Sequence, residues 1–346
     1  MDDKTLCVNL EFLMKFIDEG LGIDRTKNTI NGFNFVVPLV ESSAYNSYLE
    51  NVSNKTDTLY LRIEESLISM MKYAYLKYIE GISKKFRLKE KEVILAFDYT
   101  EEDFYGNVQG LDIHGWKRKD AVKGHFKFLT CSIISDKIPE KIPLISTPIR
   151  IGHYKSHEIL YCLSLIKDYI GEVKLILFDR EFHNNDLMFE LTKLKYPFLI
   201  FIRKLPEYKK FLEELEQGKT IVVHDYTVNK DKSNYEGENY LAFLKEIYDP
   251  RSKKKYDWIF ATNVEKIALG NLIGTYKKRW RIETQFRVQD EARIRCRSKD
   301  MKVRYFLFLF EQMLQVQWIC FHKDDIPFKE YIIAMANVAK KWGRTE

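Results

Sequence analysis

The stretch EVILAFD, residues 92–98, decides the fold, because the chain repeats its pattern as VKLILFD, residues 173–179. Each stretch is a run of apolar side chains that ends in Phe-Asp. Continuous apolar runs are typical of strands buried on both faces, as in parallel sheets covered by helices. If the two strands are neighbours, both terminal aspartates reach the same edge of the sheet.

The segments around these strands alternate between strand and helix patterns. Residues 124–134 and 197–204 predict further strands, and residues 156–170 and 184–194 carry helical spacing. The last of these helices begins with two asparagines, which are candidate caps. The alternation predicts an α/β fold, with a mixed and partly parallel sheet flanked by helices.

Two segments depart from this alternation. Residues 1–88 are helical, as in RIEESLISMMKYAYLKY (62–78), whose apolar residues form one face. Residues 205–257 contain a charged helix and a mostly β pattern, which we interpret as an insertion. The strand pattern returns at DWIFATN (257–263), and a long helix follows from about 269 to 289. The predicted units are therefore 1–88, 89–204, 205–257 and 258–346.

Composition indicates a globular chain with one basic segment. The 346 residues are 45% hydrophobic and 31% charged, and the net charge is +6. Between Tyr276 and Lys302, ten Lys or Arg stand against four Asp or Glu, so this segment holds the whole surplus. Such a local surplus is the footprint of a polyanion contact, and a solvated charge run is the alternative.

Other features of the sequence favour a cytoplasmic protein without membrane contact. The five cysteines are far apart and include no CxxC pair, which favours a reducing compartment over a disulfide framework. The N-terminus, MDDKTLCVNLEF, is acidic where a signal peptide is basic. The most apolar stretch, residues 305–321, carries Glu311 and three glutamines, so it predicts a buried helix.

The aspartates that close the two repeated strands, Asp98 and Asp179, are candidate metal ligands. Two carboxylates at one sheet edge repel each other, and a divalent cation removes the conflict. Carboxylate oxygens without His or Cys suit Mg²⁺ or Mn²⁺ rather than zinc. The alternative is that each aspartate caps the element that follows its strand.

A third carboxylate, Glu283, lies inside the basic stretch YKKRWRIETQFR, residues 276–287. On a helix, Glu283 shares one face with Tyr276 and Arg279. An Arg279–Glu283 surface ion pair is the alternative, but its order opposes the helix dipole and it contributes only a few tenths of a kcal/mol. A third ligand that completes a two-metal site explains the pattern better.

These residues resemble the DDE transposases of bacterial and archaeal insertion sequences. Tyr276, Arg279 and Glu283 match the Tyr-x-x-Arg-x-x-x-Glu signature of one branch, and FDREF (178–182) resembles the motif around the second acid. The resemblance covers roughly residues 90–302. The signature commonly ends in Lys seven residues after the Glu, where this chain has Asp290.

The resemblance implies a ribonuclease-H-like fold in which Asp98, Asp179 and Glu283 are catalytic and hold two Mg²⁺ ions, with Mn²⁺ as a substitute. It also implies cleavage of double-stranded DNA at the terminal inverted repeats of a transposon, and joining of the freed 3′-hydroxyl ends to target DNA. A homodimer would hold the two ends together, and the protein would be nucleoid-associated in a prokaryote. A nuclease without strand transfer, or an inactive DNA-binding descendant, are the competing interpretations.

We expect DNA contacts from the signature helix and the residues after it. The resemblance assigns phosphate contacts to Tyr276 and Arg279, and Trp258 and Trp280 are candidates for stacking on an unpaired base. The segment HGWKRKDAVKGHFK (114–127) is basic and follows the first catalytic strand, so it is a further candidate. The remaining cations expected to contact DNA are Lys277, Lys278, Arg281, Arg287, Arg293, Arg295 and Arg297.

Two further features have alternative interpretations. His153 and His157 lie four residues apart, and without a third ligand a surface pair is favoured over a metal site. Residues 1–88 contain none of the three acids, so we assign them to recognition of DNA ends. The alternative for 62–78 is that this helix covers one face of the catalytic sheet.

Overall fold

The computed structural model describes residues 2–24, 30–115, 121–135, 141–213, 215, 221–228, 237–249, 253–264 and 271–342. One mixed sheet has the strand order β3-β2-β1-β4-β5-β8-β7-β6. Its strands are β1 (Val93–Phe104), β2 (Gly124–Ile133), β3 (Ile142–Ile149), β4 (Val173–Phe178), β5 (Phe198–Phe201), β6 (Ile221–Val228), β7 (Gly237–Asp249) and β8 (Lys254–Thr262).

The first five strands have the connectivity of a ribonuclease-H-like sheet. β1, β2 and β3 are antiparallel neighbours, whereas β4 and β5 run parallel to β1 on its other side. The predicted α/β fold with a mixed sheet is therefore confirmed. The sequence pattern did not predict β3, because its stretch IPLISTPI contains two prolines. Proline is tolerated at β3 since this strand lies at the edge of the described sheet.

The insertion continues the sheet instead of forming a separate layer. β6, β7 and β8 are antiparallel, and β8 pairs with β5 through Leu199 and Thr262. The pairing of β6 with β7 confirms the predicted β pattern, whereas the turn between them lies outside the described residues. α8 (Pro206–Glu213) packs against β7, as expected for a helix next to the insertion.

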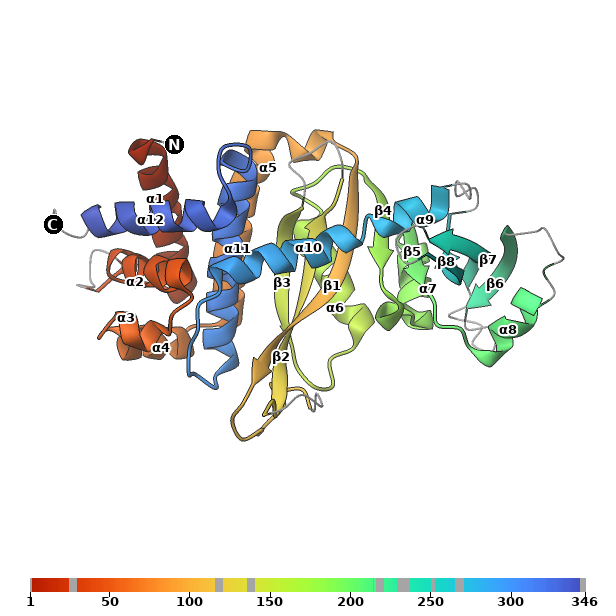
Figure 1. Ribbon diagram of the computed structural model, residues 1–346, viewed down its shortest axis with the longest axis horizontal. Coiled ribbons are helices and arrows are strands. Elements are labelled where there is room, and N and C mark those ends of the chain that lie inside the picture. The colour runs from red at the N-terminus through yellow and green to blue at the C-terminus, as the bar shows by residue number, and fades with distance from the viewer. Residues whose placement is uncertain are drawn as a thin grey trace.

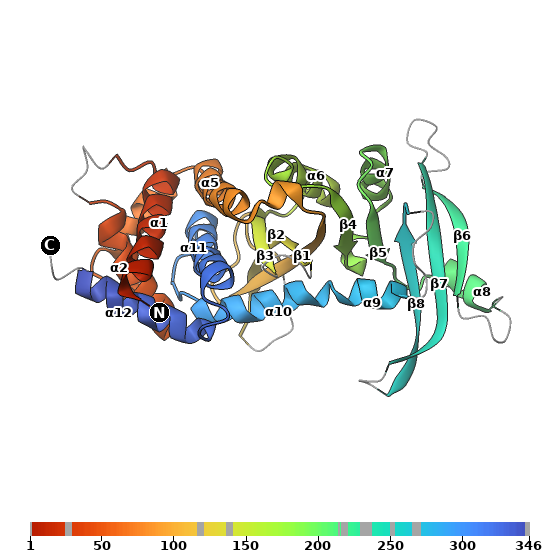
Figure 2. The ribbon, with the colours of Figure 1, turned by 90° about the horizontal axis from the view of Figure 1, so that it is seen from above.

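Helices cover both faces of the central strands (Figures 1 and 2). α6 (Lys155–Ile166) and α7 (Asn185–Lys193) lie on one face, and Asn184 caps α7 through the backbone N–H of Leu187. α9 (Leu272–Lys277) and α10 (Trp280–Gln289) cross the other face. The predicted long helix is thus present but interrupted at Lys278 and Arg279, and its expected start at 269 lies outside the described residues.

A helical bundle closes the end of the sheet next to β3. It contains α1 (Asp3–Leu21), α2 (Gly32–Tyr45), α3 (Leu49–Val52), α4 (Thr56–Glu65), α5 (Ile68–Phe86), α11 (Met301–Phe321) and α12 (Phe328–Trp342). Short 3₁₀ turns are η1 (Leu88–Glu90), η2 (Arg180–Phe182) and η5 (Asp290–Ala292). Because α12 packs against α1 and α2, the two ends of the chain share one hydrophobic core.

α11 is the buried helix that its sequence predicted. Its polar residues bond to other elements: Gln312 accepts from Ser146 on β3, Gln315 donates to the backbone of Gln285, and Gln317 donates to that of Asn9. These hydrogen bonds connect α11 to β3, α10 and α1. No helix among the described parts of the chain is both long and apolar enough to cross a membrane.

The helix α5 packs against β3 at the edge of the sheet, whereas the alternative for residues 62–78 predicts one helix over a face of the sheet. The stretch is divided between two helices, because α4 ends at Glu65 and α5 begins at Ile68. The Tyr75 hydroxyl donates to the carbonyl of Pro143 at 2.7 Å, and the Lys72 amine donates to the hydroxyl of Thr147 at 2.9 Å. Residues 1–88 therefore share packing with the sheet. Their role in recognising DNA ends stays a prediction.

We expect Tyr75→Ala to lower the free energy of unfolding by about 3–5 kcal/mol, because it opens a cavity between α5 and β3. Tyr75→Phe keeps the ring and loses one hydrogen bond, so it should cost about 1 kcal/mol. Chemical denaturation of the full chain measures both changes. Tyr73→Ala is the matched control, since Tyr73 lies on the same helix with 62% of its surface exposed. Equal effects at the two positions would show that α5 does not pack on the sheet.

Candidate active site

The first two predicted acids lie side by side because β1 and β4 are parallel neighbours. Phe97 pairs with Phe178 at the last step of this ladder, so Asp98 and Asp179 follow directly on adjacent strands. The prediction that both acids end their strands holds for Asp179 only. β1 continues to Phe104, because β2 still pairs with it after β4 has ended.

Asp179 also caps the element that follows its strand. Its carboxylate accepts from the backbone N–H of Arg180 at 2.6 Å, at the start of η2. The capping alternative is therefore realised at this position. One bond from a backbone donor leaves the carboxylate further lone pairs, so capping and ligand binding are compatible.

Glu283 reaches the same region from α10, and Arg279 connects it to Asp98. The Arg279 guanidinium donates to Asp98 Oδ2 at 2.8 Å and to Glu283 Oε1 at 2.5 Å. The side chain of Arg279 is only 5% exposed, whereas that of Glu283 is 48% exposed. The ion pair considered from the sequence is present, but it belongs to a buried bridge between two acids and not to a surface pair.

The helix interruption positions Arg279 for this bridge. The backbone N–H groups of Lys278 and Arg279 bond three residues back, to Thr275 and Tyr276, which tightens the turn between α9 and α10. The Nε atom of Arg279 is buried without a hydrogen-bond partner among the described residues. The guanidinium is thus held by its charge contacts with the two acids rather than by a complete set of hydrogen bonds.

Burial raises the pKa of Asp98 to about 6. The positive charge of Arg279 and the N–H of Tyr99 oppose this rise, and the nearby charges of Glu283 and Asp179 add to it. A raised pKa means that burial makes the ionised carboxylate of Asp98 unfavourable, and a cation nearby stabilises the ionised form. Perturbed carboxylates of this kind concentrate at functional sites.

Tyr276 lies beside this bridge, in an aromatic cluster. Its ring packs against Phe201, Trp258 and Phe260, with centroid distances of 5.7, 6.2 and 5.0 Å. Burial raises the pKa of Tyr276, while Arg279 lowers it. Trp258 stacks on Phe260 within this cluster, so the structure places it in packing rather than on an open surface for an unpaired base.

The carboxylate oxygens of the three acids are suitable ligands for a hard cation, but Arg279 separates Glu283 from Asp98. Asp98 and Asp179 are oxygen donors on adjacent strands, and Asp98 is largely buried, with Arg279 as its cationic partner. Within the described ranges, no three acidic, His or Cys side chains are close enough to hold a metal ion. Arg279 lies between Asp98 and Glu283, so the third ligand joins the pair only when this guanidinium is displaced.

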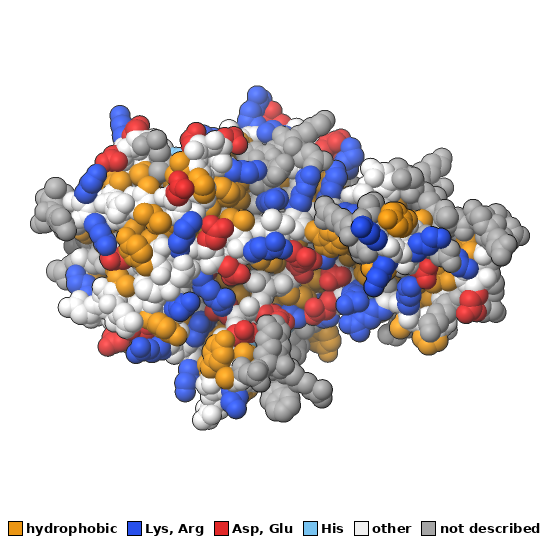
Figure 3. Space-filling view, viewed as in Figure 1, with side chains coloured by type: hydrophobic (Ala, Val, Ile, Leu, Met, Phe, Trp, Pro, Cys, Tyr) orange, Lys and Arg blue, Asp and Glu red, His pale blue; other side chains and the backbone are white. Residues whose placement is uncertain are grey.

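The other cations of the signature helix differ in their surroundings. The Arg281 guanidinium donates to the carbonyl of Ile134 at 3.0 Å, which fastens α10 to the end of β2. Lys277 lies over the ring of Trp280, and Lys278 is half-buried. Arg287 is exposed. Figure 3 shows acidic side chains gathered where α10 crosses the central strands, with Lys and Arg on either side.

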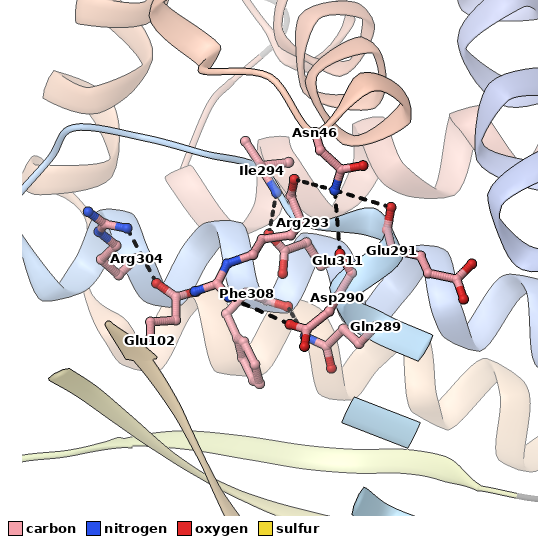
Figure 4. Close-up of polar contacts among 10 residues, drawn as sticks. All are labelled: Asn46, Glu102, Gln289, Asp290, Glu291, Arg293, Ile294, Arg304, Phe308 and Glu311. Atoms are coloured by element: carbon pink, nitrogen blue, oxygen red, sulfur yellow. Dashed lines mark hydrogen bonds and ion pairs between the residues drawn. The ribbon is translucent and has the colours of Figure 1, made fainter. Parts of the chain in front are cut away.

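Arg293 belongs to a polar network at the C-terminal end of α10 (Figure 4). It lies 3.7 Å from Asp290, and the charges of Glu102 and Glu311 also act on it. Glu311 is fully buried and accepts from the backbone N–H of Ile294 at 2.8 Å; burial raises its pKa well above the usual range. Asp290, where the signature commonly has Lys, thus pairs with Arg293, and its own side chain is 67% exposed.

The network also fastens the N-terminal bundle to the signature helix. The Asn46 amide, just after α2, donates to the carbonyls of Asp290, Glu291 and Arg293 at 3.3–3.4 Å. Arg304 on α11 pairs with Glu102 on β1 at 3.5 Å. The sequence did not reveal this network, because its members are far apart in the chain and carry no motif.

Arg295 and Arg297 alternate with buried Ile294 and Cys296, as in an extended segment. The backbone of Arg295 pairs with Ser47 and Leu49, and the guanidinium of Arg297 lies 5.3 Å from the Tyr48 ring centroid. Both arginines are exposed.

His153 pairs with Glu158 at 2.9 Å and His157 with the ring of Tyr154, so the described contacts are those of a surface pair.

Comparison with known proteins agrees with this geometry. Residues 149–311 match the family model described as transposase DDE domain. This part of the chain is therefore similar to the DDE domain of transposases. The matched range includes Asp179 and Glu283 and begins after Asp98, whose place beside Asp179 comes from the β1–β4 pairing.

Structural comparison extends the likeness over nearly the whole chain. The fold resembles that in the cryo-EM structure of the piggyBac transposase synaptic complex with hairpin DNA, with a TM-score of 0.63 and 10% sequence identity. The alignment covers 98% of this chain and 81% of that one. No curated protein matches the sequence. The DDE domain therefore lies within a fold that includes the helical bundle and the insertion.

We expect Asp98→Asn to raise stability at pH 7.5 by up to about 3 kcal/mol, because it removes a buried charge. A carboxyl pKa raised from 3.8 to about 6 makes folding lose stability as pH rises between these values. The gain should therefore shrink as pH falls toward 4. Thermal or chemical unfolding at pH 4.5, 6 and 7.5 measures it. Asp168→Asn, at an exposed site, should show no such trend. A gain independent of pH would contradict the argument.

Proposed function

We propose that this transposase cuts the ends of an insertion sequence and joins the freed 3′-hydroxyl ends to target DNA. The observation that supports the proposal is the convergence of Asp98, Asp179 and Glu283 at one edge of the sheet, with Arg279 between them. The substrate would be double-stranded DNA, at the terminal inverted repeats and at the target.

The three carboxylates would hold two divalent cations, Mg²⁺ or Mn²⁺. When bound, such ions supply the polarisation of the phosphodiester and the activation of the attacking oxygen. Asp98 and Asp179 form the fixed part of the site, because the β1–β4 pairing holds them. Glu283 forms the adjustable part, since it lies on a helix and is half-exposed.

Arg279 would change partners during the reaction. In the structure its guanidinium pairs with both Asp98 and Glu283. Once cations neutralise the acids, the same guanidinium is free to donate to a phosphate of the substrate, for which its planar fork is suited. Tyr276 packs against Arg279 and keeps it directed at the acids. The resemblance also implies that Tyr276 contacts DNA. For this contact, Tyr276 would have to leave its packing against Phe201, Trp258 and Phe260.

Joining two ends to one target requires two active sites, so we propose a homodimer on DNA. The solved relative is described as a synaptic complex with hairpin DNA, and we extend assembly on DNA ends to this chain. A nucleoid-associated location in a prokaryote would follow from this role. A nuclease without strand transfer remains the alternative, and it differs in producing cut ends that are never joined.

We predict that Asp98→Ala, Asp179→Ala and Glu283→Ala each abolish cleavage in Mg²⁺ and leave DNA binding intact or tighter, because a carboxylate without metal repels phosphate. Cleavage and strand-joining assays on labelled DNA with element ends, together with binding assays, measure this. Asp168→Ala should keep full activity. Near-normal cleavage by any one of the three variants would show that the substituted residue is not a metal ligand. Cleavage by the wild type without any joined product would favour the nuclease.

We predict that Arg287→Ala lowers the slope of log affinity against log salt by about 0.9, the loss of one phosphate contact on duplex DNA. Arg287 is exposed on α10, one turn beyond Glu283. Binding titrations between 50 and 200 mM salt give the slope. Lys84→Ala, a cation at the far end of α5, is the control and should leave it unchanged. Equal slopes for the two variants would place the DNA elsewhere.

A further inference from the structure

A second group of cations lies on the face of the sheet opposite α10. Lys127 on β2 and Lys155 at the start of α6 contact Glu181, which follows Asp179 and Arg180. Arg203, just after β5, is near enough for its charge to act on Lys155. Lys127 Nζ lies 2.6 Å from Glu181 Oε1, and Lys155 Nζ donates to the Glu181 carbonyl at 2.6 Å. We call these three cations the α6-side cluster.

The α6-side cluster holds more positive charge than its neighbours balance. Glu181 is the carboxylate that contacts both lysines, and nearby Glu158 is engaged with His153. Burial lowers the pKa of Lys155, Glu181 raises it, and repulsion from Lys127 and Arg203 lowers it further. Cations that are held together against repulsion gain from an anion, and the first turn of α6 has no side-chain cap that would occupy its N–H groups.

The cluster and the acids occupy two sides of one sheet edge. Side chains alternate along β1, so Tyr99 points away from Asp98. Lys127 lies over the Tyr99 ring at 3.9 Å, and this ring stacks on Phe182. Arg279 approaches Asp98 from the α10 side. A strand that crosses the acids therefore meets Arg279 on one side and the α6-side cluster on the other.

A groove for an unstacked base adjoins the cluster. Tyr154, which precedes Lys155, is 73% exposed, and its ring lies 5.5 Å from that of His157. The groove between α6 and α7 has a volume of about 660 Å³, and its lining includes Tyr154, His157, Phe189, Asp186 and Glu190. The two carboxylates disfavour a phosphate there. They are suited to accept hydrogen bonds from the amino group of a base.

We propose that a DNA strand leaving the active site binds this face, with its phosphates on the α6-side cluster and one unpaired base against Tyr154. The proposal rests on the proposed function, because it takes the acids as the cutting site. The acceptors Asp186 and Glu190 select bases that carry an exocyclic amino group (adenine, cytosine and guanine) over thymine. Trp258 cannot serve this purpose in the structure, since it packs against Phe201, Phe260 and Tyr276.

The test uses the full chain and forked DNA, in which a duplex carries a short single-stranded tail. The Lys155→Gln, Arg203→Gln double variant should lower the salt slope of binding by about 1.4, from about 0.7 for each phosphate contact on a single strand. Lys174→Gln is the matched control, because Lys174 lies at the opposite end of β4 and is 63% exposed. Melting temperatures show whether the variants remain folded.

The contact between Tyr154 and the unpaired base is measured by the fluorescence of 2-aminopurine placed in the single-stranded tail. Stacking on Tyr154 should quench its fluorescence, Tyr154→Leu should abolish the quenching, and Tyr154→Phe should keep it. The wild type should bind dA or dC tails more tightly than dT tails, and Asp186→Asn with Glu190→Gln should remove that preference.

An unchanged salt slope in the folded double variant, or quenching that persists in Tyr154→Leu, overturns the inference. If the wild type still cuts DNA, the proposed function survives that result. A wild type that binds no DNA overturns both.

Discussion

The parallel pairing of β1 with β4 is the constraint on which the rest of the site depends. Phe97 and Phe178 face each other at the last step of this ladder, with ring centroids 5.5 Å apart. Their stacking fixes the register, and a shift by one residue would send Asp98 to the opposite face. Because the pair is buried on both faces, the position of the two aspartates is set by the core and not by the loops around it.

Arg279 offsets the unfavourable burial of the Asp98 charge. A largely buried Asp98 needs a positive partner, and in the structure the guanidinium supplies it while it also contacts Glu283. A site without metal cations therefore keeps one positive charge beside its carboxylates. The same contact keeps Glu283 apart from the two aspartates, so metal binding and rearrangement of Arg279 are expected to be coupled.

The helical bundle determines where α10 can lie. Asn46 bonds to three carbonyls at the end of α10, and Gln315 on α11 bonds to the backbone of Gln285 within it. Arg304 and Glu102 connect α11 with β1. The bundle thus acts as the frame that holds the helix of Glu283 against the strand of Asp98, whatever further role residues 1–88 have in DNA recognition.

Sequence alone determined the elements whose signal is local. Apolar runs ending in Asp predicted β1 and β4, and helical spacing with a signature predicted α9 and α10, because these patterns reflect burial and periodicity along the chain. It did not predict β3, whose prolines hide an edge strand. Nor could it tell that Arg293 lies within reach of the charges of Glu102 and Glu311, since those residues come from distant segments. Whether a charged side chain faces DNA, a core or an acid depends on what packs opposite it, and only the tertiary structure decided that.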